Sequence, residues 1–377
     1  MERKVSMILL NSIENDIRVK KECHFLVECG YEVEVICWKR ESDISDSYYL
    51  TKGIKVVNIG IFSKYGSGKK QIFKLLDFFF RTKKYLKNRK TDILHIHDIE
   101  AALFLCFYKP NKVIVDLHEM LEKERTGKII NRILMYFYKI ILKKVDGVIL
   151  VSNYQLKKYK KFLPRNILFL YNYPSKYIFS QINKIRKSKY FQININYTGS
   201  VRNVYYLKNL ITASKNLLRT KVFINGTGTD LNNLMDYCVQ IDNKNVKFTG
   251  KFIAKDIENL YKNMDLTYSV LSENIENARI SFPTKAYESL MLGIPLIVNK
   301  KTIIAEYIEK NKIGFCIEPN LESLKELLED LEKNPAKIQC CKLRIQELIA
   351  NKEINFCWED QIKNFEKFYS TIYRKGI

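Results

Sequence analysis

Short apolar runs alternate along this chain with segments of helical periodicity, and this alternation limits the possible fold more than any other feature of the sequence. The first run, residues 5–12, precedes a segment in which Val19, Cys23 and Leu26 recur at helical spacing before Gly30. Short buried strands that alternate with helices are typical of a parallel sheet covered by helices on both faces. The sequence therefore predicts an α/β fold.

The apolar runs form two series, which indicates two domains. We expect a doubly wound, Rossmann-like domain over residues 1–175, a connection over 176–190 and a second domain of the same type over 191–355. Residues 356–377 form an amphipathic helix in this prediction, and 377 residues suit two cores of moderate size. The runs expected as strands are residues 5–12, 31–38, 53–60, 92–98, 112–119, 147–152, 167–172, 193–200, 221–228, 246–251, 266–271, 295–300 and 314–319.

The composition excludes several classes of protein. Hydrophobic residues make up 46% of the chain, and glycine and proline number only 14 and 7, so long disordered segments are not expected. No run of about 18 apolar residues occurs, which argues against a membrane-spanning helix. The nine cysteines are scattered without a Cys-x-x-Cys pair, as expected for reduced thiols in the cytoplasm.

The net charge of +23 points to an anionic partner. No acidic residue occurs between Asp146 and Asp230, a stretch that carries fifteen lysines and arginines. Nucleic acid, an anionic lipid surface and a phosphorylated small molecule would each suit such a charge, and a solvated basic surface is the alternative.

Three of the four histidines lie at the ends of expected strands of the first domain, where parallel sheets bind ligands. His95 and His97 should point to the same face, because side chains alternate along a strand. With Asp98 and Asp116 they could form a metal site, although no cysteine or histidine partner has ligand-like spacing. We favour a polar role in a cleft for His97 or His118. A buried histidine bonded to backbone is the alternative, above all for His95.

Glycines mark the ends of the first expected strands in the second domain. Gly199, Gly226 and Gly228 would let the backbone approach a ligand closely, and a helix that starts after such a turn favours an anion. Arg202 and Lys208 follow the first turn and could neutralise a diphosphate. Ordinary surface cations of a helix are the alternative for both.

The segment from Pro283 carries a cation and a carboxylate at the start of one helix. Pro283 suits the first turn and Thr284 can cap it, so backbone amides and the helix dipole should attract a phosphate there. Lys285 adds a positive charge. Glu288 lies about one turn further on the same face, where it could accept hydrogen bonds from ribose hydroxyls. The pattern predicts a nucleotide-sugar site.

These residues together resemble the retaining glycosyltransferases of the GT-B architecture, family four (glycosyltransferases group 1), of the bacterial surface-polysaccharide type. The most specific segment, FPTKAYESLMLGIPLIV at 282–298, is similar to the family pattern (F/P)-(N/T)-K-x-x-E-x-x-x-x-G-x-P. YTGS, VFINGTG, VKFTGKF and CWEDQ, with DIRVKKECHFLVECGYEVEVI and VDLHE in the first domain, also match in order. The resemblance implies two facing Rossmann-like domains, a donor site mainly in the second, and a C-terminal helix that crosses back.

The resemblance also implies roles for individual residues. Glu288 would hold the donor ribose, Arg202 and Lys208 the diphosphate, and His118 would lie near the transferred sugar; we expect these four to be catalytic. Gly199 and Ser200 match the phosphate-side turn, and Lys251 and Phe252 the loop near the base. With the residues argued above, the expected donor-binding set is Gly199, Ser200, Gly226, Gly228, Lys251, Phe252, Pro283, Thr284, Lys285 and Glu288, and the acceptor-side set is Asp16, Arg18, His97, Asp98 and Glu119.

One position departs from the family pattern. Many members carry a glutamate eight positions before the ribose-binding one, and here that position is Ile280. The contact to the donor sugar is then missing, or it comes from Glu273, Glu276 or Asn277. The donor sugar therefore stays open.

The chain has no Asp-x-Asp metal motif, so we expect neither a metal nor another cofactor. Arg202, Lys208, Lys285 and amides at the helix start would stabilise the charge on the leaving nucleoside diphosphate, which we expect to be UDP. As the resemblance implies, the acceptor hydroxyl attacks on the face that the diphosphate leaves, and the leaving phosphate takes its proton. His118 would position the sugar.

Two segments of the first domain are both basic and aromatic, residues 69–90 and 128–144. Such helices can lie on an anionic membrane surface, and burial of one face against the sheet is the alternative. We expect a cytoplasmic protein, peripheral on the inner face of the cell membrane, with a lipid-linked glycan acceptor. Assembly of capsule, O-antigen or exopolysaccharide is the expected setting, and the oligomeric state stays open.

Three other functions remain open. The charge allows a nucleic-acid-binding protein, but the chain lacks the motifs of such folds and we expect no nucleic-acid partner; a salt titration of DNA or RNA binding would decide. Ile280 allows a catalytically silent partner subunit, which would release no sugar from any nucleotide sugar. A sugar-nucleotide epimerase would have the same two domains and would need no acceptor.

Overall fold

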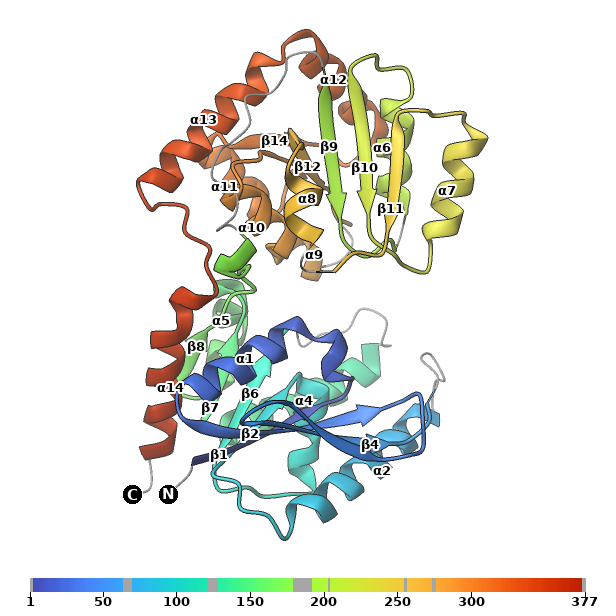
Figure 1. Cartoon of the computed structure of the whole chain (residues 1–377). Coiled ribbons are helices and arrows are strands. Elements are labelled where there is room, and N and C mark those ends of the chain that lie inside the picture. The colour runs from blue at the N-terminus through green and yellow to red at the C-terminus, as the bar shows by residue number, and fades with distance from the viewer. Residues whose placement is uncertain are drawn as a thin grey trace. The chain divides into compact units, whose positions relative to one another are not determined.

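The computed structural model describes residues 3–63, 70–120, 128–178, 192–202, 204–253, 256–272 and 276–374. The chain divides into two compact units: residues 1–171 with 360–377 form the first, and residues 172–359 form the second (Figure 1). Each unit has its own sheet, and each is described by itself below.

An eight-stranded sheet forms the centre of the first unit. Its strands are β1 (Arg3–Leu9), β2 (Tyr31–Lys39), β3 (Asp46–Thr51), β4 (Ile54–Gly60), β5 (Ile93–His97), β6 (Val113–Leu117), β7 (Gly147–Leu150) and β8 (Ile167–Phe169). The order in the sheet is β3-β4-β2-β1-β5-β6-β7-β8, and all neighbours pair in parallel except β3 with β4.

The edge strand β3 is the strand of this sheet that the sequence analysis did not predict. It runs antiparallel to β4, with Tyr48 opposite Val56. Its sequence DSYYLT is polar and mostly exposed, so it has no apolar run that would reveal it. An antiparallel edge strand can face water, whereas the buried parallel strands cannot.

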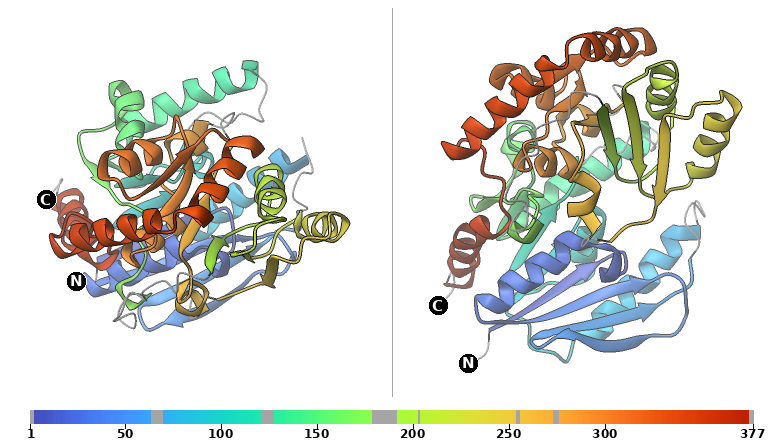
Figure 2. Two further views of the ribbon diagram at one scale, coloured as in Figure 1. Left: turned by 90° about the horizontal axis from the view of Figure 1, so that it is seen from above. Right: turned by 45° about the horizontal axis from the view of Figure 1, so that its top comes forward.

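Helices cover both faces of the first sheet. They are α1 (Ile17–Glu28), α2 (Lys70–Leu86), α3 (Ile99–Ala102), α4 (Lys128–Lys144), α5 (Asn153–Tyr159) and α14 (Ile362–Arg374), with 3-10 turns η1 (Ile13–Asn15), η2 (Leu103–Cys106) and η3 (Lys160–Phe162). The chain moves towards one edge of the sheet after β1 and towards the other edge after β4. Right-handed crossovers therefore put α1 and α2 on opposite faces, and Figures 1 and 2 show α1 lying along its face.

The last helix of the chain, α14, packs against the first unit. The rings of Phe25 in α1 and Phe365 in α14 meet edge to face with centroids 5.5 Å apart. Lys112 donates from Nζ to the carbonyl oxygen of Ile372 at 2.7 Å. A Cβ atom on Gly147 would lie 2.5 Å from the Ile372 side chain, so this glycine lets helix and strand approach closely.

A six-stranded, all-parallel sheet forms the centre of the second unit. Its strands are β9 (Ile193–Thr198), β10 (Thr220–Asn225), β11 (Val246–Gly250), β12 (Leu266–Ser269), β13 (Leu296–Asn299) and β14 (Gly314–Ile317), in the order β11-β10-β9-β12-β13-β14. The helices are α6 (Tyr205–Ser214), α7 (Leu231–Gln240), α8 (Ile257–Tyr261), α9 (Glu276–Ile280), α10 (Thr284–Met291), α11 (Ile303–Asn311), α12 (Leu321–Lys333) and α13 (Ala336–Ala350), with 3-10 turns η4 (Lys176–Ile178) and η6 (Glu359–Gln361), which reaches the unit boundary.

The two sheets confirm the predicted α/β fold with two Rossmann-like, parallel-sheet domains. In each sheet the strand order reverses at one place, between β1 and β5 in the first unit and between β9 and β12 in the second. Ligands of doubly wound sheets bind outside the strand ends at such a switch point. Among the described residues, no helix is both long and apolar enough to cross a membrane.

Candidate functional site

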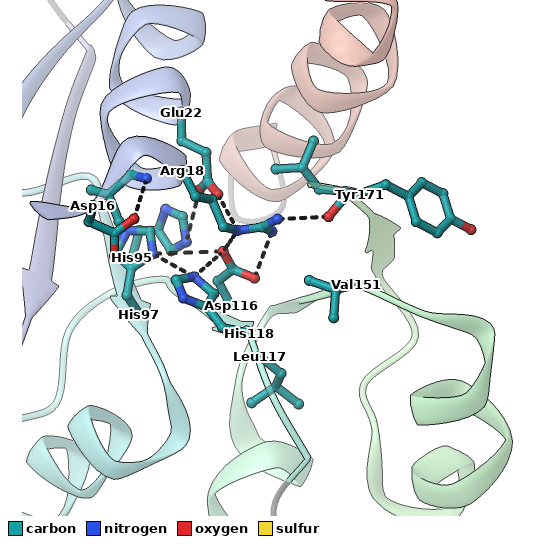
Figure 3. A network of polar contacts seen from close by, with 12 residues as sticks. Asp16, Arg18, Glu22, His95, His97, Asp116, Leu117, His118, Val151 and Tyr171 are labelled. Atoms are coloured by element: carbon teal, nitrogen blue, oxygen red, sulfur yellow. Dashed lines mark hydrogen bonds and ion pairs between the residues drawn. The ribbon is translucent and has the colours of Figure 1, made fainter. Parts of the chain in front are cut away.

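Polar side chains gather at the carboxyl ends of the central strands of the first sheet (Figure 3). They come from α1, β5, β6 and the residues just after β6, next to the switch point. We call them the first-unit network: Arg18, Glu22, His95, His97, Asp116 and His118.

Arg18 lies at the centre of this network. Its Nε and Nη2 donate to the two carboxylate oxygens of Asp116 at 2.9 and 3.0 Å, and Nη1 donates to the carbonyl oxygen of Leu170 at 2.8 Å. Nε also lies 2.9 Å from Oε1 of Glu22, one turn further along α1. Such a bidentate, charge-assisted pair fixes the orientation of both partners.

Asp116 also sets the charge of His118. Nε2 of His118 lies 2.9 Å from Oδ2 of Asp116, and Nδ1 lies 3.7 Å from Oδ1 of Asp98. Burial alone would lower the pKa of His118, but the two carboxylates outweigh it and raise that pKa to about 9. Burial would raise the pKa of Asp116, yet Arg18 and His118 hold it well below its usual range. At neutral pH the pair is therefore an imidazolium and a carboxylate.

The remaining members of the network favour their neutral forms. Burial and the charge of Asp116 raise the pKa of Glu22 well above its usual range, and burial lowers the pKa values of His95 and His97. Nδ1 of His95 lies 2.7 Å from the hydroxyl of Tyr369 in α14, and Nε2 lies 3.8 Å from Oε2 of Glu22. The two histidine rings are 4.2 Å apart, on one face of β5 as strand alternation predicts.

The other residues predicted for the acceptor side lie around the network. Asp16 caps α1 by accepting from a first-turn amide at 3.0 Å, which fixes the start of the helix that carries Arg18. Asp98 directly follows β5 with a φ of 68°, in the left-handed region. Glu119 is exposed, and its carbonyl oxygen accepts from Gln155 at 2.9 Å. The structure therefore brings all five predicted positions, His97 included, to one end of the sheet.

Four of these side chains have the composition of a metal site. One ligand atom each of Glu22, His97, Asp116 and His118 lies within 4.8 Å of the others. The guanidinium of Arg18, however, is 2.9 Å from both carboxyl groups and already supplies the positive charge that the Asp116 carboxylate requires. A divalent cation would have to displace it, so the arrangement suits a positioned imidazolium better than a metal.

The loops after β9, β10 and β11 pack tightly against one another in the second unit. After β9, the amides of Gly199 and Val201 donate to the carbonyl oxygens of Asn225 and Thr227, at and just after the end of β10, both at 3.0 Å. The amide of Gly226 donates in turn to the carbonyl oxygen of Gly250 at the end of β11, at 2.9 Å. A Cβ atom added to Gly226 would lie 1.9 Å from the carbonyl oxygen of Gly199. A Cβ atom added to Gly228 would lie 2.1 Å from the carbonyl oxygen of Val201. Loop packing alone therefore requires glycine at both positions, and their role in donor binding stays a prediction.

Lys285 in α10 contacts the end of β9, just before the first of these loops. Its Nζ lies 3.9 Å from the ring centroid of Tyr197, whose hydroxyl donates to the carbonyl oxygen of Ser200 at 2.8 Å. Burial lowers the pKa of Lys285 to about 7, although the carboxylate of Glu288 opposes the shift. A diphosphate beside it would favour the charged form, so this lysine can respond to an anionic ligand.

Glu288 is buried, with 6% of its surface exposed, and accepts a hydrogen bond from the Tyr261 hydroxyl at 3.0 Å. Tyr261 belongs to an apolar cluster between α8 and the end of α10, and Phe252 packs against that cluster. Phe252 therefore supports the tyrosine that orients Glu288, and the neighbouring Lys251 is exposed. The contact of Lys251 and Phe252 with the nucleotide base stays a prediction.

The two cations predicted for the diphosphate have different surroundings. Arg202 is exposed directly after the Gly199 turn, and its amide donates to the carbonyl oxygen of Ser200 at 3.2 Å. Lys208 points to α7 instead: Nζ donates to Oδ1 of Asn233 at 3.0 Å and lies 4.9 Å from the centroid of a tyrosine ring on that helix. The contact of Arg202 and of Lys208 with a diphosphate stays a prediction.

The start of α10 differs from the expectation in one detail. Pro283 is the N-cap residue, with an extended ψ of 147°, and Thr284 is the first helical residue. Thr284 was expected to cap the helix and does not, since the cap has no side-chain hydrogen bond. The cap residue therefore supplies no side-chain acceptor, and the free amides of the first turn are of the kind that can bind an anion.

Ile280, which stands where many family members have a glutamate, lies in α9. Ile280 is the last residue of α9 and is partly buried, and Glu276 is the first residue of the same helix. Glu273 and the side chain of Asn277 lie outside the described residues.

Sequence reasoning missed Glu22, Tyr261 and Tyr369, and considered Asp116 only as a metal ligand. Two of these had a signal: Glu22 follows Arg18 by four residues on one helix face, and Asp116 precedes His118 by two on one strand face. The tyrosines had none, because each meets its partner only through the tertiary fold.

Two family models match consecutive parts of the chain. Residues 18–172 match the family described as Glycosyltransferase Family 4, and residues 180–362 match the family described as Glycosyl transferases group 1. No curated protein matches this chain.

Several solved structures share the fold. Sucrose-phosphate synthase (tll1590) from Thermosynechococcus elongatus has a TM-score of 0.76 at 14% identity, with 100% of both chains covered. A glycosyltransferase from Rickettsia africae ESF-5 has a TM-score of 0.68 at 14% identity, also with 100% of both chains covered. Anabaena Alr3699/HepE in complex with UDP-glucose has a TM-score of 0.69 at 13% identity, covering 97% of this chain and 99% of that one.

Proposed function

This chain belongs to the group 1 family of GT-B glycosyltransferases, and on that basis we propose that it transfers a sugar from a nucleoside diphosphate sugar to a glycan, with retention of anomeric configuration. We propose UDP as the nucleoside diphosphate, because the similar HepE structure is a complex with UDP-glucose. The sugar itself is not assigned.

The observation that carries this proposal is the pairing of Lys285 with Glu288 on one helix start beside the Gly199–Ser200 turn. A carboxylate offers about four lone-pair sites, so Glu288 can accept ribose hydroxyls in addition to the hydroxyl of Tyr261. Lys285, with its pKa of about 7, would gain a proton and bind the diphosphate. Because Tyr261 orients the carboxylate before any ligand binds, ribose binding needs little reordering.

The transfer needs no protein nucleophile in this proposal. As the bond between the sugar and the diphosphate breaks, negative charge grows on the leaving phosphate, and Lys285, Arg202 and the amides at the start of α10 stabilise it. The acceptor hydroxyl attacks from the same face, and its proton passes to the leaving phosphate. His118, charged and held by Asp116, positions the transferred sugar. We propose that no metal takes part.

Donor binding tests the proposal directly. We expect Glu288→Ala to weaken UDP-sugar binding about 10- to 100-fold, as the loss of hydrogen bonds to a charged group implies. Binding is measured by calorimetry over a panel of nucleotide sugars, with release of the sugar as the second readout. Glu326→Ala, an exposed carboxylate of α12 in the same unit, is the matched control and should change neither.

An unchanged donor affinity in Glu288→Ala would remove the proposed donor site. Sugar release from any nucleotide sugar by the unaltered protein would exclude a catalytically silent subunit. Interconversion of nucleotide sugars in the absence of an acceptor would favour an epimerase.

We further propose that the acceptor is a lipid-linked glycan and that the enzyme attaches to the inner face of the cell membrane during surface-polysaccharide assembly. Two helices of the first unit support this. On α4, the exposed Ile130, Ile133, Phe137 and Ile140 recur at i, i+3, i+7 and i+10. A soluble face would carry polar residues at these positions, whereas a membrane-surface helix carries apolar ones.

Helix α2 repeats the pattern. Phe73 and Phe80 are 73% and 55% exposed, seven residues apart on one face, with Lys83 and Lys84 in the last turn. We expect Phe73→Ser with Phe80→Ser to reduce binding to anionic vesicles, and the matched control Leu343→Ser, an exposed leucine of the second unit, to leave it unchanged. Equal binding of all three proteins would contradict membrane attachment.

A further inference from the structure

A groove of about 550 Å³ lies between α2 and the outer strands β3 and β4 of the first sheet. Its walls come from the beginning of β3, the outer strand β4 and the last turns of α2. Four of the lining side chains are cations: Lys55, Arg81, Lys84 and Arg89.

Two acidic side chains lie beside this groove, Asp46 and Glu34, and each has partners of its own. Asp46 accepts from the amide of Asn58 at 2.6 Å and pairs with Lys39, and these contacts lower its pKa. Glu34 is buried and accepts from the hydroxyl of Tyr85 at 2.8 Å, and its Oε1 lies 3.8 Å from Nη1 of Arg89. Glu34 therefore partly balances Arg89, while Asp46 is committed to Lys39 and leaves the two lysines of the groove unbalanced.

The cations differ in how far they are engaged. Arg81 donates to Asp77 at 3.0 Å, and the guanidinium of Arg89 stacks on the ring of Tyr85 at 4.1 Å. Neither Lys55 nor Lys84 has a hydrogen-bond or ion-pair partner among the residues that the structure describes. Two uncommitted ammonium groups beside a fixed guanidinium suit a group with several anionic oxygens.

The groove is separate from the first-unit network. Strand β4 is four strand intervals away from β6, which carries Asp116, and at about 4.8 Å an interval this is roughly 19 Å. A sugar held at His118 cannot reach the groove, so its ligand is a different one.

We propose that this groove binds the phosphate of an anionic phospholipid headgroup. The reason is its continuity with the apolar face of α2: Lys84 lies one turn after the exposed Phe80 and lines the groove. A lipid whose tail lies beside Phe80 would bring its phosphate to Lys84, Lys55 and Arg89. The inference rests on the membrane attachment proposed above, and adds a specific headgroup site to it.

The first test uses a soluble probe, so that it does not depend on membrane binding or on sugar transfer. Glycerol phosphate is titrated into the full-length protein and followed by NMR. We expect saturable binding that is about tenfold weaker in Lys55→Gln with Arg89→Gln. Lys325→Gln with Lys333→Gln, which removes the same charge from α12 of the second unit, is the control and should bind as the unaltered protein does. Non-saturable binding, or equal weakening in both double variants, would overturn the site.

The second test separates a lipid headgroup from a soluble phosphate. Sedimentation with vesicles of phosphatidylcholine, with and without phosphatidylglycerol, is compared for the same proteins. We expect the groove variant to lose the preference for phosphatidylglycerol, while the control variant keeps it. If the groove variant lost glycerol phosphate binding but kept its vesicle preference, a soluble phosphate would be the ligand and the lipid assignment would be wrong. Thermal unfolding of each variant shows whether it remains folded.

Discussion

The charge of His118 provides the sharpest test of the first-unit network. Asp116 accepts from this imidazole at 2.9 Å and is itself held by Arg18, so Asp116→Asn removes the charge while keeping the shape of the side chain. We expect the pKa of His118 to fall from about 9 to its ordinary value of about 6.5 or below, since burial alone lowers it.

The stabilisation that the charged His118 gives the folded protein follows from the same two pKa values. A difference of about 2.5 pH units between two pKa values corresponds to about 3 kcal/mol, and the 16% exposure of the His118 side chain will reduce this through screening by water. Because folding raises this pKa, the stabilisation is complete below about pH 6.5 and disappears as the pH rises through about 9. The thermal midpoint of the first unit should therefore fall between these two pH values, and this fall should be smaller in Asp116→Asn.

The assay is a pH titration of the imidazole carbons by NMR, which is simple because the chain has only four histidines. Asp98→Asn is the control: its carboxylate is 3.7 Å from His118 and 36% exposed, so its removal should lower the pKa much less. A His118 pKa near 6.5 in the unaltered protein, or an equal fall in both variants, would refute the reasoning.

Three further predictions concern the second unit. Because the pKa of Lys285 is about 7, donor affinity should decrease as the pH rises through 7, and calorimetry should find no such decrease in Lys285→Met. Gly226→Ala should lower the thermal midpoint far more than Gly250→Ala, since the new Cβ meets a backbone carbonyl at 1.9 Å in the first case and nothing within 4 Å in the second. Lys342→Met leaves the buried carboxylate of Asp265 without its cation, with the amide of Asn194 still donating to it at 2.9 Å, which should cost about 3–5 kcal/mol in urea unfolding; the double variant with Asp265→Leu should recover part of this loss.

Most of the fold could be predicted from the sequence because most of the parallel strands are buried on both faces. Each is then a short apolar run between helices, and the period of the pattern changes from strand to helix along the chain. The exception, β3, shows the limit of this signal: its outer face is solvated, so its residues resemble a loop. The helix starting near Pro283 was visible for a different reason, since proline and glycine mark its two ends.

The candidate sites could be predicted only in part, because sequence position does not determine which way a side chain points. Lys208 illustrates this: it follows the Gly199 turn closely in sequence, yet α6 turns it towards Asn233 on α7. The glycines illustrate a second limit. The sequence pattern attributes the glycine at position 226 to the close approach of a ligand. The structure shows that the carbonyl oxygen of Gly199 already leaves no room for a side chain there.

The first-unit network is more than a means of stabilising the sheet. A buried ion pair of this kind gains little over well-packed apolar residues, because removing two charges from water costs about as much as their attraction returns. Its members are graded in exposure, with Asp116 and Glu22 at 0%, Arg18 at 8% and His118 at 16%. Of these four side chains, His118 is the most exposed to solvent, and its imidazole is protonated at neutral pH. The buried residues therefore act together to keep one positive charge, fixed in orientation, at the switch point where a sheet of this type binds its ligand.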